Sequence, residues 1–376
     1  MIIVHIVEPF AAGIAVFVKS LTEAMPDDMH IIVHGERKKE MSAREVKKTF
    51  PRQNVRFIKW RSAQRSIDPL KDLLALAELY KILRRLKRKN LVDAVHLHSS
   101  KSGLLGRAAC KMAGVTNVFY TPNGASFLSA PNRLARYFYQ QLERVGHRLG
   151  GNVVCCSASE LEEFVKLGIN AGYINNGINI NQQQRTTINI NNREKFRVVT
   201  SGRIEKQKNP RLFNEIATYF EDMEQVEFIW IGDGSYKKYF TAKNITVTGW
   251  MGKKEVHDLV AASNIYLSTS HYEGLSFGVL EALALKKPVL LSNCTGNIDI
   301  VKKGINGDLF TKASEANVKI LQYYNNREML DVMGTFSAEI CQAEFDVKEN
   351  FKTYRELYAG SLQQVMGGKV KWNFGY

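Results

Sequence analysis

The feature that most constrains the fold is a repeated alternation of short β-branched runs with longer stretches of helical periodicity. The first half of the chain contains six runs with strand character: Ile2–Val7, Met29–His34, Val55–Ile58, Ala94–Leu97, Val118–Tyr120 and Val153–Cys156. The main stretches between them are predicted to be helices: Ile14–Ala24, Leu70–Arg88, Gly103–Met112 and Leu134–Leu149. Strands that alternate with helices in this way form parallel, doubly wound sheets, so the sequence predicts an α/β fold.

A second series of the same kind follows a polar stretch that lacks periodicity. Asn175–Asn192 is crowded with Asn, Gln and Thr and is predicted to link two domains. Beyond it come five more predicted strands: Arg197–Ser201, Val226–Ile231, Ile245–Thr248, Ile265–Ser268 and Pro288–Leu291. We expect two Rossmann-like domains, 1–178 and 179–346, that face each other across a cleft where ligands bind at the carboxyl ends of the strands. A last helix at about Val347–Val365 is expected to pack back onto the first domain, and the tail Lys369–Tyr376 is expected to be poorly ordered.

The spacing of the cysteines and the length of the apolar runs indicate the cellular compartment of the protein. The five cysteines form no CxxC pair, and Cys155 and Cys156 lie in an apolar run typical of a core, so a reducing compartment is expected. Met1–Val7 lacks a basic flank and is too short for the apolar region of a signal peptide. No apolar stretch is long enough to span a bilayer, so we expect a cytoplasmic protein that is soluble or peripheral to the membrane.

The positive charge of the chain is concentrated in its first part. Residues 1–150 contain 26 basic and 12 acidic side chains, whereas the whole chain contains 52 and 37, so 14 of the 15 excess positive charges lie there. Basic residues are densest in two clusters, Arg37–Lys48 and Arg84–Lys89. Such a surface attracts anionic lipid or phosphate-rich partners. The alternative is that these clusters are solvated helix faces that keep the protein in solution.

One strand–turn–helix segment has the chemistry of a nucleotide diphosphate site. A predicted strand ends near Ser268, and a glycine-bearing turn then leads into a helix. A helix N-terminus offers backbone N–H groups and a positive dipole end, which suit a diphosphate. Glu273 precedes the helix and Glu281 lies two turns inside it, which places their carboxylates roughly 10–12 Å apart. One could bind sugar hydroxyls and the other the ribose hydroxyls of one extended ligand.

These residues resemble a motif of retaining GT-B glycosyltransferases, specifically those of glycosyltransferase family 4. The shared pattern is Glu273-x7-Glu281 with the intervening residues Gly274, Leu275, Ser276, Phe277 and Gly278. The resemblance covers roughly residues 1–360 and is strongest in the second domain. It implies a GT-B fold in which this motif binds the donor, a nucleotide sugar.

A basic segment in the second domain completes the expected donor site. Ser201–Pro210 is similar to the family's Gly-Arg…Lys-Asn-Pro segment, whose Arg and Lys clamp the donor diphosphate; here these are Arg203 and Lys208, next to Gly202. Negative charge accumulates on the leaving diphosphate, so two fixed cations stabilise the transition state more than the ground state. The alternative is that both are ordinary surface cations.

Two further segments of the second domain resemble the family's nucleotide site. Ile229–Gly234 is a strand and turn that contributes Gly232, and Val247–Met251 resembles the loop that borders the base. Trp250 and Met251 are therefore predicted to contact the base, unless the tryptophans of these segments only fill the core.

In the first domain Gly13 is a candidate donor-binding residue, and His98 and Asn123 are candidates for contact with the acceptor or sugar. The resemblance implies a Gly-Gly turn after the first strand, of which only Gly13 is present, and the GxGxxG pattern of NAD sites is absent. His96 and His98 are predicted to point to the same side of a strand, with His98 nearer the cleft or capping the sheet structurally. Asn123 occupies the place of the family's usual His, and an amide can hydrogen-bond a hydroxyl but cannot act as a base.

The resemblance therefore predicts an enzyme that transfers a hexose-type sugar, with retention, from a nucleotide diphosphate sugar, UDP-sugar rather than GDP-sugar. The expected acceptor is a lipid-linked glycan, as in cell-envelope polysaccharide or O-antigen synthesis, at the inner face of the cytoplasmic membrane. Glu273 is predicted to orient the sugar while Arg203 and Lys208 stabilise the leaving group. No cofactor and no metal is expected, because no DxD-type cluster lies where a metal would bridge the phosphates.

Two other functions are compatible with the sequence. A pI of about 9.5 permits nucleic-acid binding, but the sequence lacks RNP, KH and zinc-finger spacing, so no nucleic-acid partner is expected. Ala12 and Asn123, which depart from the family pattern, would also fit a catalytically weakened nucleotide-sugar-binding protein.

Overall fold

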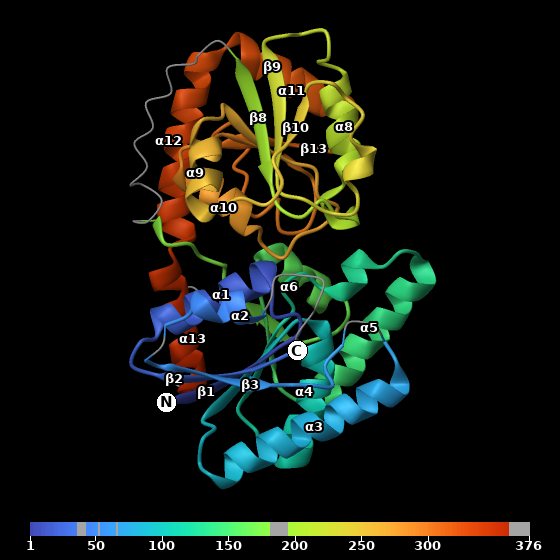
Figure 1. Ribbon diagram of the computed structural model, residues 1–376, viewed down its shortest axis with the longest axis vertical. Coiled ribbons are helices and arrows are strands. Elements are labelled where there is room, and N and C mark those ends of the chain that lie inside the picture. Colours follow the sequence, from blue (N-terminus) through green and yellow to red (C-terminus); the bar gives the residue numbers. More distant parts are fainter. Residues whose placement is uncertain (36–42, 52, 65–66, 181–194, 361–376) are drawn as a thin grey trace. The chain divides into compact units, whose positions relative to one another are not determined.

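The computed structural model describes residues 1–35, 43–51, 53–64, 67–180 and 195–360, and the chain divides into two compact units (Figure 1). Unit 1 comprises residues 1–176 together with the segment from Val347, and unit 2 comprises Gly177–Asp346. The sequence placed this boundary after residue 178. Most of the predicted linker, the predicted tail and the basic residues 37–39 lie outside the described residues.

Unit 1 is built on a seven-stranded parallel sheet in the order β3-β2-β1-β4-β5-β6-β7. Its strands are β1 (Ile2–Val7), β2 (Met29–His34), β3 (Val55–Lys59), β4 (Ala94–His98), β5 (Val118–Thr121), β6 (Asn152–Cys155) and β7 (Ala171–Tyr173). Its helices are α1 (Ala12–Ala24), α2 (Ala43–Lys48), α3 (Pro69–Arg88), α4 (Ser100–Ala113), α5 (Arg133–Arg148), α6 (Ala158–Val165) and α13 (Val347–Tyr358), with a 3-10 turn η1 (Ser126–Ser129). The six predicted strands are confirmed, whereas β7, α2 and α6 were not predicted.

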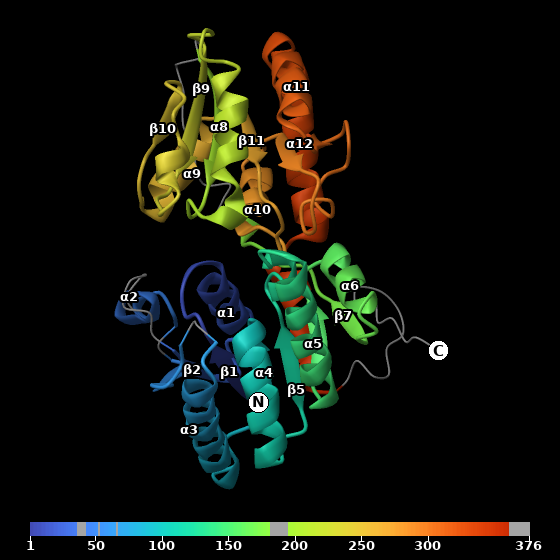
Figure 2. The ribbon, with the colours of Figure 1, turned by 90° about the vertical axis from the view of Figure 1, so that its right-hand side faces the viewer.

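The alternation of side chains along β4 shows how the two faces of this sheet are covered. Val95 and Leu97 point into an apolar core shared with α3 and α4. His96 and His98 point to the opposite face, as the sequence predicted, where α1 and α13 pack (Figures 1 and 2). The last helix thus covers a sheet whose last strand ends at Tyr173, about 170 residues earlier.

Unit 2 contains a six-stranded parallel sheet in the order β10-β9-β8-β11-β12-β13. Its strands are β8 (Phe196–Ser201), β9 (Val226–Ile231), β10 (Ile245–Val247), β11 (Ile265–Ser268), β12 (Val289–Ser292) and β13 (Gly307–Phe310), the last not predicted. Its helices are α8 (Pro210–Thr218), α9 (Lys253–Ala261), α10 (Phe277–Ala284), α11 (Ala313–Asn325) and α12 (Arg327–Glu344), with 3-10 turns η2 (Lys206–Lys208) and η3 (Lys237–Tyr239).

An aromatic core anchors the strands of unit 2. Phe213 of α8 packs edge-on against Phe228 and Trp230 of β9, and Ile320 and Met333 of α11 and α12 join the same buried cluster. Because every strand of the sheet is parallel, the loops that follow β8, β9, β11 and β12 emerge at one edge. Among the described residues, no helix has the length and apolar character needed to cross a membrane.

Candidate active site

The turns after β8 and β9 bring two glycines into direct backbone contact. Gly202 and Gly232 adopt φ of 135° and 140°, a conformation that side-chain-bearing residues rarely tolerate. A Cβ on Gly232 would lie 2.2 Å from the carbonyl oxygen of Gly202, and the buried Trp230 donates its indole N–H to that same oxygen at 2.9 Å. Glycine is therefore required at Gly232 for the two turns to meet.

Lys208 and Glu273 form an ion pair at this edge of the sheet. Lys208 Nζ lies 2.8 Å from Glu273 Oε1, and the Glu273 side chain is 8% exposed. Burial alone would lower the pKa of Lys208, but the adjacent carboxylate outweighs it and the pKa is raised. The site therefore holds a lysine ammonium group and a glutamate side chain in direct contact.

Two polar side chains that the sequence analysis missed fix the Glu273 carboxylate. Ser270 donates its hydroxyl to Oε1 at 2.6 Å, and Gln207 donates its amide to Oε2 at 3.3 Å. Behind it, the Glu273 backbone N–H bonds to Thr295, and a Cβ on Gly296 would lie 2.8 Å from the Cβ of Glu273. Gln207 lies in the 3-10 turn η2 and Ser270 in the loop after β11, and the resemblance assigns a role to neither.

The predicted turn and helix after Glu273 are present. Gly274, Leu275 and Ser276 are buried, and α10 begins at Phe277 without a side-chain cap from Ser276. A Cβ on Gly278 would lie 2.6 Å from the hydroxyl of Ser201, so the first turn of α10 packs directly against the end of β8.

Glu281, Arg203, Trp250 and Met251 occupy the same unit with different surroundings. Burial raises the pKa of Glu281, which lies in the second turn of α10, and Lys253 partly offsets the rise. Arg203 follows Gly202 and is partly buried. Trp250 is 68% exposed and Met251 partly buried, in a loop joined to the β9 turn by a bridge between Gly232 and Gly249. An exposed tryptophan is not core filling, so the alternative interpretation of Trp250 is wrong.

In unit 1, Asn123 lies in a turn tied down by a buried carboxylate. Asn123 has φ of 55°, a left-handed conformation that Asn tolerates, and donates to the carbonyl of Thr121 at 3.2 Å. Glu160, in the first turn of α6, accepts from the backbone N–H groups of Gly124 at 2.9 Å and Cys156 at 2.8 Å. Burial raises the pKa of Glu160 to about 7. Gly13 is exposed in the first turn of α1, beyond the carboxyl end of β1.

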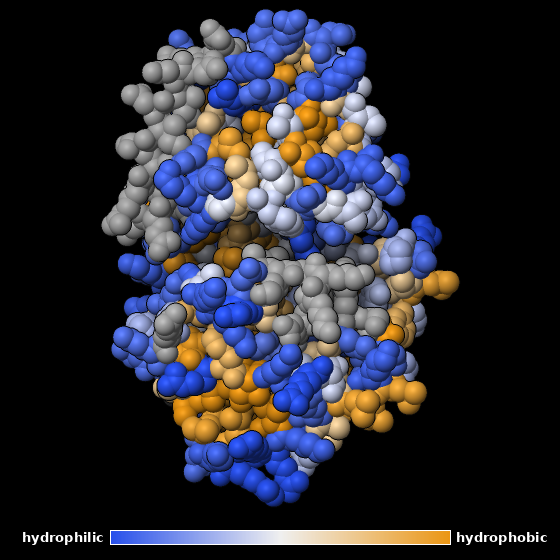
Figure 3. Space-filling view, viewed as in Figure 1, coloured by the Kyte–Doolittle hydropathy of each residue, from blue (hydrophilic) through white to orange (hydrophobic). Residues whose placement is uncertain are grey.

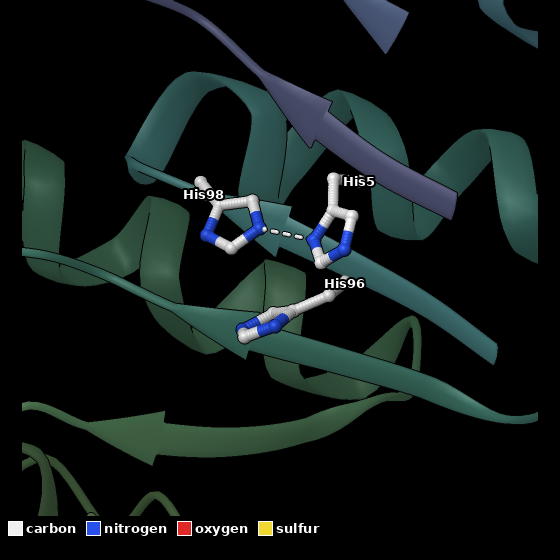
Figure 4. Close-up of side chains that lie close together, drawn as sticks. All are labelled: His5, His96 and His98. Atoms are coloured by element: carbon white, nitrogen blue, oxygen red, sulfur yellow. Dashed lines mark hydrogen bonds between the residues drawn. The ribbon is translucent and has the colours of Figure 1, made fainter. Parts of the chain in front are cut away.

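His98 belongs to a chain of buried imidazoles (Figure 4). His98 Nε2 lies 3.1 Å from His5 Nδ1, His5 Nε2 lies 3.0 Å from His30 Nδ1, and His30 Nε2 lies 3.1 Å from the Met25 carbonyl oxygen. Because a carbonyl only accepts, each neutral ring in turn must donate from Nε2, and His5 and His30 accept at Nδ1. Burial holds the pKa of each of these three histidines below its usual value.

His96 lies beside this chain and is held separately. His96 Nδ1 lies 2.6 Å from the hydroxyl of Tyr358, and its Nε2 lies 2.8 Å from that of Thr121. Burial again lowers its pKa. The nitrogens of His5, His96 and His98 are close enough to share a metal ion. However, such an ion would displace the hydroxyl contacts of His96 or the contact between His5 and His98, so the hydrogen-bonded chain accounts for these residues.

In unit 2 the structure thus brings Lys208 and Glu273 together near the packed turns of Gly202, Gly232 and Gly278. The other three predicted site residues, Gly13, His98 and Asn123, belong to unit 1. The separation predicted between Glu273 and Glu281 stays a prediction.

Two family models together match nearly the whole chain. The model described as "Glycosyltransferase Family 4" matches residues 11–182, and the model described as "Glycosyl transferases group 1" matches residues 181–339.

Named relatives and solved structures agree with these models. The chain is 27% identical to a "UDP-Gal:alpha-D-GlcNAc-diphosphoundecaprenol alpha-1,3-galactosyltransferase" of Escherichia coli over 78% of this chain and 81% of the relative. It is 24% identical to an "Alpha-monoglucosyldiacylglycerol synthase" of Acholeplasma laidlawii over 83% of each. The structure of Anabaena HepE in complex with UDP and glucose matches with a TM-score of 0.77 and 17% identity, over 95% of this chain and 99% of that one. The expected two-domain fold is confirmed.

Proposed function

The chain belongs to the group 1, family 4 glycosyltransferases of the GT-B fold, and on this premise we propose what it transfers, from what and to what. The donor is a nucleotide diphosphate sugar, a UDP-sugar in preference to a GDP-sugar, and the group transferred is a hexose-type sugar. The acceptor is a lipid-linked glycan of a cell-envelope polysaccharide or O-antigen. The names of the E. coli and A. laidlawii relatives, one with a UDP-galactose donor and both with lipid-containing molecules, support this choice.

The observation that carries the proposal is the Lys208–Glu273 pair at the strand edge of unit 2. An ammonium has three donors, and the contact with Glu273 uses one of them, which leaves capacity for a phosphate oxygen. Glu273 is oriented by Ser270 and Gln207, so its carboxylate can position sugar hydroxyls with little loss of freedom. The cation would bind the diphosphate while the anion binds the sugar.

The proposed reaction uses these residues as follows. The bond between the anomeric carbon and the diphosphate oxygen breaks, and its electron pair stays on the diphosphate. Arg203, Lys208 and the backbone N–H groups at the start of α10 stabilise that charge. The acceptor hydroxyl attacks from the face that the leaving group vacates, and its proton passes to the departing phosphate oxygen. The products are a glycoside of retained configuration and a nucleoside diphosphate, without a protein base and without a metal.

A donor screen followed by a matched pair of variants tests this function. Thermal unfolding with UDP, GDP and ADP and their sugars identifies the donor, because a ligand that binds the folded state stabilises it. We expect stabilisation by UDP above that by GDP. Transfer to a lipid diphosphate-linked sugar acceptor is then measured with and without a chelator, and the anomeric proton coupling of the early product reports its configuration.

The variants Lys208→Met and Glu273→Gln separate binding of the diphosphate from positioning of the sugar. We expect Lys208→Met to weaken UDP binding and transfer together, and Glu273→Gln to reduce transfer at least about 100-fold while UDP still binds. The controls are Lys254→Met and Glu215→Gln, at exposed positions of α9 and α8. Wild-type transfer by Glu273→Gln would contradict the proposal. UDP-sugar binding without transfer across a panel of acceptors would instead identify a nucleotide-sugar-binding protein.

The same proposal places the enzyme at the inner face of the cytoplasmic membrane, as a peripheral protein. The excess of basic residues in unit 1 supports this location, since each basic residue near an anionic membrane contributes about 1 kcal/mol. Fractionation of cells that produce the chain tests it: we expect recovery with membranes at low salt and release at high salt.

A further inference from the structure

The helix α5 has an apolar stripe on the side that faces away from the core of unit 1. At about 100° per residue, Leu134, Tyr137, Phe138 and Val145 fall within an arc of roughly 100° on the helix surface. They are 83%, 62%, 49% and 47% exposed. The opposite side carries the buried Glu143 and Gly146. Tyr139, on that inner side, packs against the core, so the exposed stripe is additional to the apolar contact by which α5 covers the sheet.

Arginines border this stripe. Arg133 and Arg148 are exposed and Arg144 is half-buried. On the same helical geometry Arg133 and Arg144 lie beside one edge of the stripe, and Arg148 lies just inside that edge. Arg136, on another side, is half exposed and pairs with Glu163 at 3.4 Å. The sole acidic residue of α5, Glu143, is buried against Arg107 at 3.1 Å. The outer surface of α5 therefore combines apolar side chains with positive charge.

A second group of exposed apolar residues lies at the start of α3. Ile67, Leu70, Leu73 and Leu74 are 56% to 78% exposed. Because α4 packs against both α3 and α5, the three helices cover the same face of the sheet, and their outer sides face the same way (Figure 2). Figure 3 shows hydrophobic residues over α5 and over the neighbouring end of α3. We call the outer side of α5 and the start of α3 the apolar–basic face.

We propose that the apolar–basic face docks on an anionic lipid bilayer, with Leu134, Tyr137 and Phe138 inserted at the interface and Arg133 and Arg148 among the headgroups. Large exposed apolar side chains on a helix bordered by arginines are the features of helices that lie in a membrane surface. Leucines alone would also suit a protein partner, but the arginines favour an anionic surface. The inference deepens the proposed function, because α5 follows the turn that holds Asn123 and so places the membrane beside that edge of unit 1.

Vesicle binding tests the docking surface directly. The full chain is sedimented with vesicles of phosphatidylglycerol and phosphatidylethanolamine and, in parallel, with vesicles of phosphatidylcholine. We expect binding to the anionic vesicles alone. The variant Leu134→Ser/Tyr137→Ser/Phe138→Ser should lower the partition coefficient at least about tenfold, and Arg133→Gln/Arg148→Gln should lower it and reduce its salt dependence. The control Val318→Ser/Val332→Ser/Phe336→Ser, at exposed apolar positions of unit 2, should bind like the wild type.

A tryptophan reporter gives a second test that does not depend on a variant losing its binding to vesicles. Leu134→Trp should be quenched by brominated anionic lipids more than the wild-type tryptophans are, because residue 134 would enter the bilayer. Unchanged vesicle binding by the triple serine variant would overturn the proposal, as would absence of binding by the wild type. A dimer of the wild type in light scattering that the serine variant loses would assign the face to a second copy of the chain instead. Stabilisation by UDP and transfer to a soluble acceptor should persist in the serine variant, so a failure of docking is distinguishable from a failure of the proposed activity.

Discussion

Acid should selectively destabilise unit 1, because four of its histidines are buried in the neutral form. Burial lowers the pKa values of His5, His30, His96 and His98 below 6.5 in the folded state. Below pH 6.5 the unfolded chain therefore binds more protons than the folded chain, so stability falls as the pH falls. Each histidine contributes up to about 1.4 kcal/mol per pH unit. If all four stay neutral in the fold, they remove about 5 kcal/mol between pH 7.5 and 5.5.

Glu160 acts with the opposite sign. Its folded-state pKa of about 7 exceeds the usual 4.5, so the folded state gains a proton first as the pH falls and recovers about 2 kcal/mol by pH 5.5. The raised pKa of Glu143 acts in the same direction. The net expectation is a loss of about 3 kcal/mol or slightly less, which is a large fraction of the stability of an ordinary domain.

Hydrogen exchange resolved by mass spectrometry measures this loss unit by unit. Peptides from β1 and β4, corrected for the intrinsic effect of pH on exchange, should lose protection at pH 5.5 more than peptides from β8 and β9. Unit 2 is a suitable reference because it has only two of the eight histidines, His257 and His271. Glu160→Gln should steepen the loss toward about 5 kcal/mol, and His98→Gln should reduce the net loss by up to about 1.4 kcal/mol. Equal protection of β1 at pH 7.5 and 5.5 would refute the reasoning.

Three further changes have expected outcomes. Gly232→Ala should destabilise unit 2 by roughly 2–4 kcal/mol in urea unfolding and weaken UDP binding, because its Cβ would overlap the carbonyl of Gly202; unchanged unfolding would contradict the required contact. Arg107→Met should cost roughly 3–5 kcal/mol, since it leaves the buried Glu143 without its cation, and Arg107→Met/Glu143→Gln should recover part of that loss. Trp250→Ala should change stability by less than about 0.5 kcal/mol but weaken nucleotide binding, as calorimetric titration with UDP would show.

The sequence predicted the elements whose periodicity is strong. The runs that became β1 and β9 have their predicted bounds, because long β-branched runs between helices have few alternative structures. The three-residue β7 and the glycine-containing β13 were missed, since short strands are defined by pairing with neighbours and not by their own pattern.

Single residues of the candidate site could be predicted from motifs, but the contacts between them could not. Lys208 and Glu273 were identified, but their ion pair was not, because it depends on where two loops 65 residues apart meet. The alternation of His96 and His98 was readable in the sequence. The contact of these histidines with His5 could not be predicted, because it depends on the parallel register in which His5 lies opposite His96.

The place of α13 in unit 1 has a consequence for synthesis. Tyr358 bonds to His96, Phe351 packs against Phe17, and Arg355 pairs with Asp28. A nascent chain that has passed residue 176 therefore still exposes the part of this sheet face that α13 covers until unit 2 has been translated. At about 5–20 residues per second that interval is roughly 10–40 s. The unit that is translated first is the last to be completed, and a chaperone that shields aromatic surface would find its substrate during this interval.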